Sequence, residues 1–306
     1  MYELLILGAG SAGLTAAIYA ARAGLNFAVL EQDGWGGGQI SSAHQVQNYP
    51  GVPEVSGADL GEKLRQQAET LGTEVLCAEI GRVERRDNLF YLTDTDGEQF
   101  QAKAVIAATG AFPRKLGLPG EEALTGAGVS YCAVCDGAFY AGKDVLVVGG
   151  GNTGVEDALY LSSICRSVTV LLRRAVFRAA RTRVDLLLKQ PNVTVLDNTT
   201  VAALHGRERL EAVTLQTEGE SREVPADGLF VAVGHVPATD CLRELPLCLE
   251  GGYVAAGEDC VTTVPGLFAA GDIRTKPLRQ AVTAAADGAN AANSAIAYLM
   301  NFEAGD

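Results

Sequence analysis

The sequence predicts an α/β protein in which one three-layer domain is inserted into another. Two segments, Gly8–Gly13 and Gly149–Gly154, share the pattern Gly-x-Gly-x-x-Gly, and each follows an apolar strand and opens a helix. This order is typical of Rossmann-like nucleotide-binding domains with parallel sheets. After the second copy the chain returns to a further strand and a long helix, which makes the first domain discontinuous. We therefore predict a first domain of residues 1–113 and 244–306, and a second of residues 114–243.

The first segment has the full context of a dinucleotide fingerprint. Its predicted elements are strand Leu4–Leu7, helix Leu14–Ala23 and strand Phe27–Leu30. Gly8 allows the tight turn, Gly10 lets the backbone approach a pyrophosphate, and Gly13 lets helix and strand pack closely. Glu31 ends the second strand, where a carboxylate accepts hydrogen bonds from an adenosine ribose. The segment therefore predicts a dinucleotide with an unmodified ribose.

The second segment repeats the pattern but reverses the charge at its end. Its predicted elements and glycines are strand Val145–Val148, Gly149, Gly151, Gly154, helix Val155–Ser163 and strand Val168–Leu172. Arg173 and Arg174 follow the last strand, and Arg178 comes four residues later. Guanidinium groups suit a 2′-phosphate, which they can bind with two hydrogen bonds. This predicts NADPH, although the arginines could also form the solvated start of a helix.

The two halves also leave their sheets alike. Residues 102–113 and 226–237 each read as a buried strand, a glycine and a proline, and they predict hinges near 112–119 and 236–243. Beyond the second hinge, strand Leu267–Ala270 leads into Gly271 and Asp272, ahead of a helix over about Gln280–Leu299. An acid at the end of a buried strand could receive a ribityl hydroxyl, so Asp272 is a candidate flavin contact.

The stretch "YCAVCDG" places Cys132 and Cys135 two residues apart, directly before Asp136. Such a pair could be half of a zinc site, a structural disulfide or a redox-active pair. A zinc site needs four ligands, and the chain has three histidines and no second CxxC. A short loop gains little stability from closure. Between two nucleotide sites, a redox-active pair is favoured. Most of the remaining cysteines are expected to be free and packed: Cys77, Cys165, Cys241, Cys248 and Cys260.

Composition narrows the partners. The 306 residues carry a formal charge of −13, which disfavours nucleic acid and anionic membranes. The apolar start lacks a basic region and breaks at Gly8, and no stretch of about 18 apolar residues follows. We expect a cytoplasmic protein, without a metal, that acts on a small soluble acceptor or a protein.

Several motifs together give the chain a resemblance to the low-molecular-weight thioredoxin reductases, over nearly its whole length. They are "GGGQI" at 36–40, Asn48-Tyr49-Pro50, "ATG" at 108–110, "CAVCDG" at 132–137, "GGGNTG" at 149–154, "FAAGD" at 268–272 and "RQA" at 279–281. Their order along the chain makes the resemblance more specific than any one motif.

The resemblance implies that NADPH reduces FAD, that the flavin reduces the Cys132–Cys135 disulfide, and that the dithiol reduces thioredoxin or a thioredoxin-like protein. It implies that Asp136 is the general acid/base, that two domains rotate, and that the protein is a homodimer. The implied FAD contacts are Gly8, Gly10, Ser11, Ala12, Gly13, Glu31, Gly37, Gly38, Gln39, Asn48, Thr109, Gly110, Gly271, Asp272, Arg279, Gln280 and Ala281. The implied NADPH contacts are Gly149, Gly151, Asn152, Thr153, Gly154, Arg173, Arg174 and Arg178.

Three departures from the family pattern leave alternatives open. Leu172 replaces the usual histidine before the arginine pair, Val134 replaces the more common threonine between the cysteines, and Trp35 precedes the Gly-Gly-Gln loop. An aromatic pair after "CDG" is also reduced to Phe139. The chain could therefore use NADH or ferredoxin as donor, or serve a different disulfide partner. A non-catalytic nucleotide sensor is disfavoured by the retained cysteines and acid.

Overall fold

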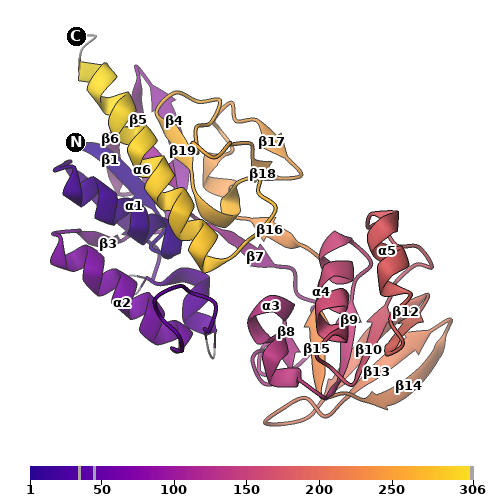
Figure 1. Cartoon of the computed structure of the whole chain (residues 1–306). Helices are drawn as coiled ribbons and strands as arrows, with labels where there is room; N and C mark the ends of the chain where they lie inside the picture. Colours follow the sequence, from indigo (N-terminus) through magenta and orange to yellow (C-terminus); the bar gives the residue numbers. More distant parts are fainter. Residues whose placement is uncertain (34–35, 44–45, 304–306) are drawn as a thin grey trace. The chain divides into compact units, whose positions relative to one another are not determined.

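The computed structural model describes residues 1–33, 36–43 and 46–303. The chain forms two compact units, the first of Met1–Phe112 with Val236–Asp306 and the second of Pro113–His235 (Figure 1). The sequence predicts Pro113 in the first domain and residues 236–243 in the second, whereas Pro113 belongs to the second unit and 236–243 to the first. Trp35 lies outside the described residues.

The first unit is built on a seven-stranded sheet in the described residues. Its strands are β1 (Tyr2–Leu7), β2 (Phe27–Glu31), β3 (Val75–Cys77), β4 (Ile80–Arg86), β5 (Leu89–Asp94), β6 (Gln99–Ala107) and β19 (Leu267–Ala269). The order is β3-β2-β1-β6-β5-β4, and β19 pairs in parallel with the end of β6. The strands β1, β2, β3, β6 and β19 run parallel, so their carboxyl ends meet at one edge, where ligands bind in open α/β sheets.

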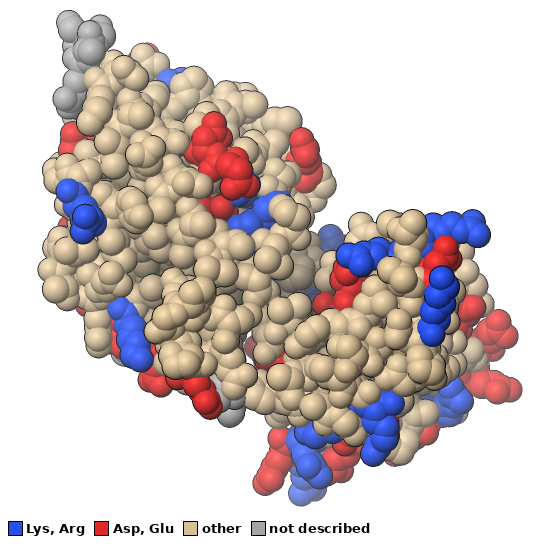
Figure 2. Space-filling model, viewed as in Figure 1, with Lys and Arg blue, Asp and Glu red and all other residues tan. Residues whose placement is uncertain are grey.

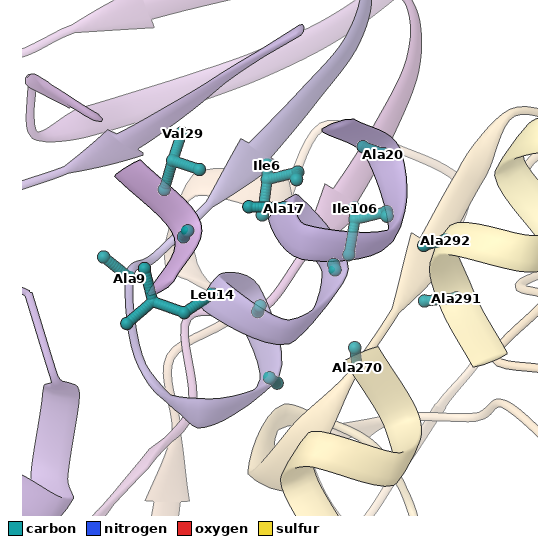
Figure 3. Close-up of a cluster of buried hydrophobic side chains, with 14 of the residues drawn as sticks. Ile6, Ala9, Leu14, Ala17, Ala20, Val29, Ile106, Ala270, Ala291 and Ala292 are labelled. Carbon is teal, nitrogen blue, oxygen red and sulfur yellow. The ribbon is translucent and has the colours of Figure 1, made fainter. Parts of the chain in front are cut away.

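Three helices of this unit are α1 (Ser11–Arg22), α2 (Gly57–Thr70) and α6 (Ala281–Glu303). Figure 3 shows side chains of the sheet, among them Ile6, Val29 and Ile106, in one buried cluster with Leu14 of α1 and Ala291 of α6. The alanine-rich faces let α1 and α6 pack closely. At Gly288 a Cβ atom would lie 2.1 Å from the Ala12 carbonyl oxygen, so glycine is required at this crossing.

The second unit has its own parallel sheet, in the order β11-β10-β9-β15-β8, and a separate antiparallel sheet, β12-β13-β14. The strands are β8 (Val129–Ser130), β9 (Asp144–Val148), β10 (Ser167–Leu171), β11 (Val193–Leu196), β12 (Thr199–His205), β13 (Ala212–Thr217), β14 (Glu220–Pro225) and β15 (Gly228–Val231). The helices are α3 (Ala133–Asp136), α4 (Asn152–Ser162) and α5 (Arg181–Leu187). A core of apolar residues from β9, β10 and α4 is buried beneath the second glycine fingerprint.

The chain crosses between the units in β7 (Ala111–Pro113) and β16 (His235–Pro237), which pair with each other. A short hairpin of β17 (Leu249–Glu250) and β18 (Tyr253–Val254) belongs to the first unit. In the described part of the chain, no helix is long and apolar enough to cross a bilayer.

Both fingerprint helices begin three residues earlier than predicted. The sequence predicts starts at Leu14 and Val155, whereas α1 begins at Ser11 and α4 at Asn152. The predicted starts are wrong because they place the third glycine before the helix. In the structure Gly13 and Gly154 lie in the first helical turn, where they allow the helix to approach the preceding loop.

Candidate active site

The first glycine fingerprint forms a tight backbone cradle. Gly8 has φ +95°, and a Cβ atom there would lie 2.6 Å from the Ala108 carbonyl oxygen. A Cβ at Gly13 would lie 1.8 Å from the carbonyl oxygen of Gly8. Because such contacts are impossible for a side chain, both positions require glycine. The N-terminus of α1, with Ser11 and Ala12 in its first turn, follows directly.

The Gly-Gly-Gln loop lies over this cradle. Gly37 donates from its backbone nitrogen to the Ala9 carbonyl at 2.7 Å, and a Cβ at Gly38 would lie 2.9 Å from the Gly10 Cα atom. Gln39 donates from Nε2 to the Ala111 carbonyl at 2.6 Å, beside Gly110. The structure therefore brings the loop and the segment after β6 together around Gly10.

The C-terminal segment closes the same region. A Cβ at Gly271 would lie 3.0 Å from the Ala12 Cβ atom, and Asn48 donates to the side-chain oxygen of Gln280 at 3.0 Å. Thr109 donates to the Ala238 carbonyl at 2.7 Å. Segments distant in sequence thus converge at the carboxyl edge of the sheet, and Ala281 begins α6 there.

Arg279 takes a position that the sequence did not predict. Its guanidinium carbon lies 4.0 Å from the centre of the Tyr253 ring, and its Nε atom is buried and makes no hydrogen bond to any described residue. A guanidinium on an aromatic face is a favourable cation–π contact. The rest of the guanidinium can still donate to a ligand at this edge.

Asp272 has a buried carboxylate oxygen that no described residue satisfies. Its Oδ1 atom is buried without a hydrogen-bond partner among the described residues, and burial raises the pKa of its carboxyl group, although Lys276 and Arg279 act in the opposite direction. A buried carboxylate oxygen without a donor is costly. Hydroxyl donors supplied by a ligand, such as those of a ribityl chain, would remove that cost.

Glu31 lies where the fingerprint predicts an acid, at the end of β2. Its Oε2 atom accepts from the Ala9 backbone nitrogen at 2.6 Å, and its Oε1 atom accepts from Gln32 at 2.9 Å. The carboxylate therefore also fastens the fingerprint loop to β2, a role that the sequence pattern does not reveal.

A buried ion network behind Gly271 was missed by the sequence analysis. Asp287 of α6 accepts from the Gly271 backbone nitrogen at 2.9 Å, from Arg274 at 2.7 and 2.9 Å, and from Lys276 at 2.7 Å. Burial alone would raise the pKa of Asp287, but the bonds from Arg274 and Lys276 hold it below the usual value. The network fixes the turn that carries Asp272. Its only sequence signal is an acid on an otherwise alanine-rich helix.

The second cradle repeats the geometry of the first. Gly149 has φ +134°, and a Cβ there would lie 2.3 Å from the Ala232 carbonyl oxygen. A Cβ at Gly154 would lie 2.2 Å from the Gly149 carbonyl oxygen. A Cβ at Gly151, by contrast, would meet nothing within 4 Å among the described residues. Asn152 accepts from the Ala180 nitrogen at 3.1 Å, and Thr153 is exposed in the first turn of α4.

The three predicted arginines are exposed beside this cradle. Among the described residues, the side chains of Arg173, Arg174 and Arg178 make no hydrogen bond or ion pair, so their donors are available to a ligand. Leu172 is only 2% exposed, and its side chain packs under Gly150 in the core. Lys and Arg side chains are interspersed with Asp and Glu on the visible face of the second unit (Figure 2).

The cysteine pair lies at the start of α3. Cys132 and Cys135 form a disulfide, and Cys132 is the N-cap residue of the helix. Asp136 ends the helix and accepts from the Ser130 hydroxyl at 2.7 Å. Val134, between the cysteines, is 47% exposed, and Phe139 is 38% exposed. Both cysteines are half-buried, and exposed apolar side chains lie next to them in the chain.

Comparisons with known proteins agree with this geometry. Residues 2–288 match the family model described as pyridine nucleotide-disulphide oxidoreductase. A thioredoxin reductase of Streptomyces clavuligerus is 42% identical over 97% of this chain and 94% of its own, and one of Treponema pallidum is 40% identical over 97% of each. The crystal structure of thioredoxin reductase from Streptococcus pyogenes has a TM-score of 0.92 at 38% identity and covers 99% of both chains.

Proposed function

The chain belongs to the pyridine nucleotide-disulphide oxidoreductase family, and on that premise we propose that it is a thioredoxin reductase that uses NADPH and FAD. One observation supports this above the others. The Cys132–Cys135 disulfide lies in the same unit as a second, open glycine cradle, while another unit holds a separate dinucleotide cradle. Two nucleotide cradles and a switchable sulfur pair are the parts that a flavin-dependent disulfide reductase needs.

We assign FAD to the first unit. Gly10 and the N-terminus of α1 would receive the pyrophosphate, Glu31 the adenosine ribose, and Asp272 a ribityl hydroxyl. The unpartnered Oδ1 atom of Asp272 fits a hydroxyl donor. The loop at Gly37–Gln39 and the segment Thr109–Gly110 border the same space. When bound, FAD supplies hydride acceptance from a nicotinamide and two-electron delivery to a disulfide.

We assign NADPH to the second unit. The open space at Gly151 suits a coenzyme that binds and leaves in each turnover, and the exposed guanidinium groups of Arg173, Arg174 and Arg178 suit a 2′-phosphate. Leu172 is buried in the core, so its replacement of histidine leaves those guanidinium groups in place. NADH, which lacks the phosphate, would leave the arginines without a ligand.

The protein residues at the disulfide handle protons and exchange. Reduction of the Cys132–Cys135 bond consumes two electrons and two protons, of which NADPH supplies a hydride and solvent one proton. The resulting dithiol then reduces a partner disulfide: one thiolate attacks, a mixed disulfide forms, and the second thiol resolves it. We propose that Asp136, which follows Cys135 directly, gives and takes the thiol proton.

The proposed partner is argued from the exposed side chains next to the disulfide, and the proposed compartment from the free cysteines. We propose that thioredoxin or a similar protein docks at the exposed side chains of Val134 and Phe139. On the resemblance to its family we also propose that the enzyme is a homodimer in the cytoplasm. Five cysteines are free among the described residues, and two of them, Cys77 and Cys248, are exposed. Exposed free thiols suit a reducing compartment.

The decisive experiment follows flavin and disulfide separately. We expect purified protein to be yellow, anaerobic NADPH to bleach the flavin within seconds, and a coupled assay to show reduction of thioredoxin. Cys135→Ser should retain bleaching and lose thioredoxin turnover by at least about 10³-fold, because the disulfide cannot re-form. Cys248→Ser, which alters an exposed free thiol, is the matched control.

Each outcome identifies a different failure. If reduced ferredoxin bleaches the flavin and NADPH does not, the electron donor is ferredoxin and not NADPH. Equal efficiency with NADH would refute the assigned role of the arginines. Full bleaching of the flavin without reduction of thioredoxin would mean that the disulfide partner is another protein. A colourless protein that cannot be reconstituted with FAD would refute the proposal as a whole.

A further inference from the structure

We infer that Ser130 is a positioning residue for the thiol chemistry, because its hydroxyl holds the Asp136 carboxyl group beside the cysteine pair through both of its protonation states. The inference deepens the proposed function and rests on Asp136 acting as the acid/base of the pair. Nothing in the sequence motif CxxCDG includes this serine, which lies two residues before it on β8.

The geometry is compact and buried. Ser130 is 3% exposed, and its hydroxyl lies 2.7 Å from Asp136 Oδ2. The serine oxygen also accepts from the Cys132 backbone nitrogen at 3.1 Å, and it lies 3.4 Å from the Cys132 carbonyl oxygen. One hydroxyl therefore connects the acid to the backbone of the first cysteine across the turn of α3.

A hydroxyl is suited to this place because it can donate and accept. When Asp136 is a carboxylate, the Ser130 proton must point to Oδ2, since a carboxylate has no proton to donate. When Asp136 is protonated at Oδ2, the acid can donate to Ser130, and the serine proton can turn to the Cys132 carbonyl oxygen. The carboxyl group keeps one orientation while it gains and loses a proton.

The backbone fixes the hydroxyl on the other side. β8 pairs in parallel with β15, with Ser130 opposite Phe230, so the Ser130 main chain is part of the central sheet. The cysteine pair and α3 follow this strand closely in the chain. The serine thus connects the redox turn to the parallel sheet of the unit, and removal of its hydroxyl takes one hydrogen-bond donor from Asp136 without removing a catalytic group.

The first test needs neither coenzyme nor thioredoxin. The protein is reduced with dithiothreitol and freed of it anaerobically, and the rate at which iodoacetamide alkylates Cys132 and Cys135 is measured from about pH 5 to about pH 10 by mass spectrometry of their peptide, since Cys77 and Cys248 are also exposed. In Ser130→Ala we expect the midpoint of the alkylation profile to rise by about one pH unit. Without the serine donor, the negative charge of the Asp136 carboxylate is less stabilised, and its repulsion of a thiolate in the adjacent cysteine pair is stronger, which disfavours the thiolate.

The second test asks whether Ser130 acts through Asp136. In the thioredoxin assay we expect Ser130→Ala to lower kcat about tenfold with unchanged bleaching by NADPH. In an Asp136→Asn background the same serine change should have no further effect on kcat or on the alkylation profile, because the group it positions is already disabled. Ser130→Thr, which restores a hydroxyl, should recover kcat to within about threefold.

A matched control is available in the same unit. Ser167 donates to Asp144 at 2.7 Å, a serine–aspartate bond remote in sequence from the cysteines. Ser167→Ala should leave both profiles unchanged. The inference is overturned if Ser130→Ala folds and keeps the wild-type alkylation profile, or if its effect on kcat adds fully to that of Asp136→Asn. Absence of thioredoxin turnover in every variant would count against the proposed function and leave the alkylation test intact.

Discussion

The two glycine cradles share the same close backbone contacts and differ in the segments that surround them. In each, the third glycine presses against the carbonyl oxygen of the first, at Gly13 and Gly154, and the first glycine faces the residue after a neighbouring strand. The middle glycines differ. Gly10 lies under the loop that contains Gly38, whereas the space at Gly151 is open.

This difference indicates two kinds of ligand. The first cradle is enclosed by segments from three parts of the chain and braced by the Asp287 network, as suits a cofactor that stays bound. The second is open and bordered by exposed arginines, as suits a coenzyme that exchanges. On the proposed assignment, the shared local geometry would suit a dinucleotide in both cradles, and the different surroundings would suit one resident and one exchanging ligand.

The largest expected effect comes from filling the third glycine of each cradle. Gly13→Ala places a methyl group 1.8 Å from the Gly8 oxygen, and we expect a colourless protein because the FAD cradle cannot close. Gly154→Ala, at 2.2 Å from the Gly149 oxygen, should keep the yellow colour and lose bleaching by NADPH. The visible absorption spectrum before and after anaerobic NADPH measures both.

The control for this pair is Gly81→Ala, because a methyl group there would meet no described atom nearer than 3.7 Å. It should bind and reduce flavin as the wild type does. A Gly13→Ala protein with a full complement of FAD would show that the first cradle is not where the flavin binds.

The next effect tests the brace that supports the first cradle. Asp287→Ala leaves Arg274 and Lys276 buried without their partner, and we expect a loss of about 3–5 kcal/mol in the free energy of unfolding, measured by urea denaturation. Asp240→Ala, which breaks an exposed pair with Arg243, should cost at most about 1 kcal/mol. Equal losses would contradict the special role of the network.

The same network predicts a pH dependence. The folded pKa of Asp287 is lowered, so its contribution to stability is fully present above the ordinary carboxyl pKa of about 4 and is lost as the pH falls through the lower, folded value. Asp287→Asn should therefore lose less stability than the wild type on acidification below about pH 4. Parallel curves would contradict this assignment.

A smaller effect concerns the two exposed arginines beside the second cradle. Arg173→Ala with Arg174→Ala should raise the KM for NADPH about 30-fold, since two charge-assisted contacts to a 2′-phosphate are lost. The KM for NADH should change less than about threefold. Arg207→Ala, an exposed arginine in the turn after β12, is the control. Equal changes for both coenzymes would place the phosphate elsewhere.

The smallest expected effect lies in the helix of the second cradle. Burial, with a contribution from Glu156, raises the pKa of Asp157 in α4 to about 7. Because the folded pKa is raised, the contribution of Asp157 to the free energy of unfolding is fully present below the ordinary carboxyl pKa of about 4. That contribution is lost as the pH rises through about 7. The unfolding free energy of Asp157→Asn should rise relative to that of the wild type between about pH 4 and about pH 8, because asparagine has no proton to lose. If the difference in unfolding free energy between Asp157→Asn and the wild type stays constant over that pH range, the raised pKa of Asp157 is contradicted.

Much of the site could be predicted from the sequence because its requirements are local. A glycine that must avoid a carbonyl oxygen a few residues away, as Gly13 must, leaves a pattern in consecutive residues. The same holds for an acid or an arginine pair at a strand end, and for two cysteines on one turn of α3. The predicted helix starts differ from the structure because the pattern does not tell whether the third glycine precedes or begins the helix.

The sequence by itself thus determined two nucleotide cradles, their opposite charges and a sulfur pair beside an acid. Only the tertiary structure decided that Asp287 braces Gly271, that Leu172 is buried while the arginines are exposed, and that Ser130 holds Asp136. The physical reason is distance along the chain and orientation in space. Hydrogen bonds and burial depend on where side chains of separate elements meet, and the order of residues within one element does not contain that information.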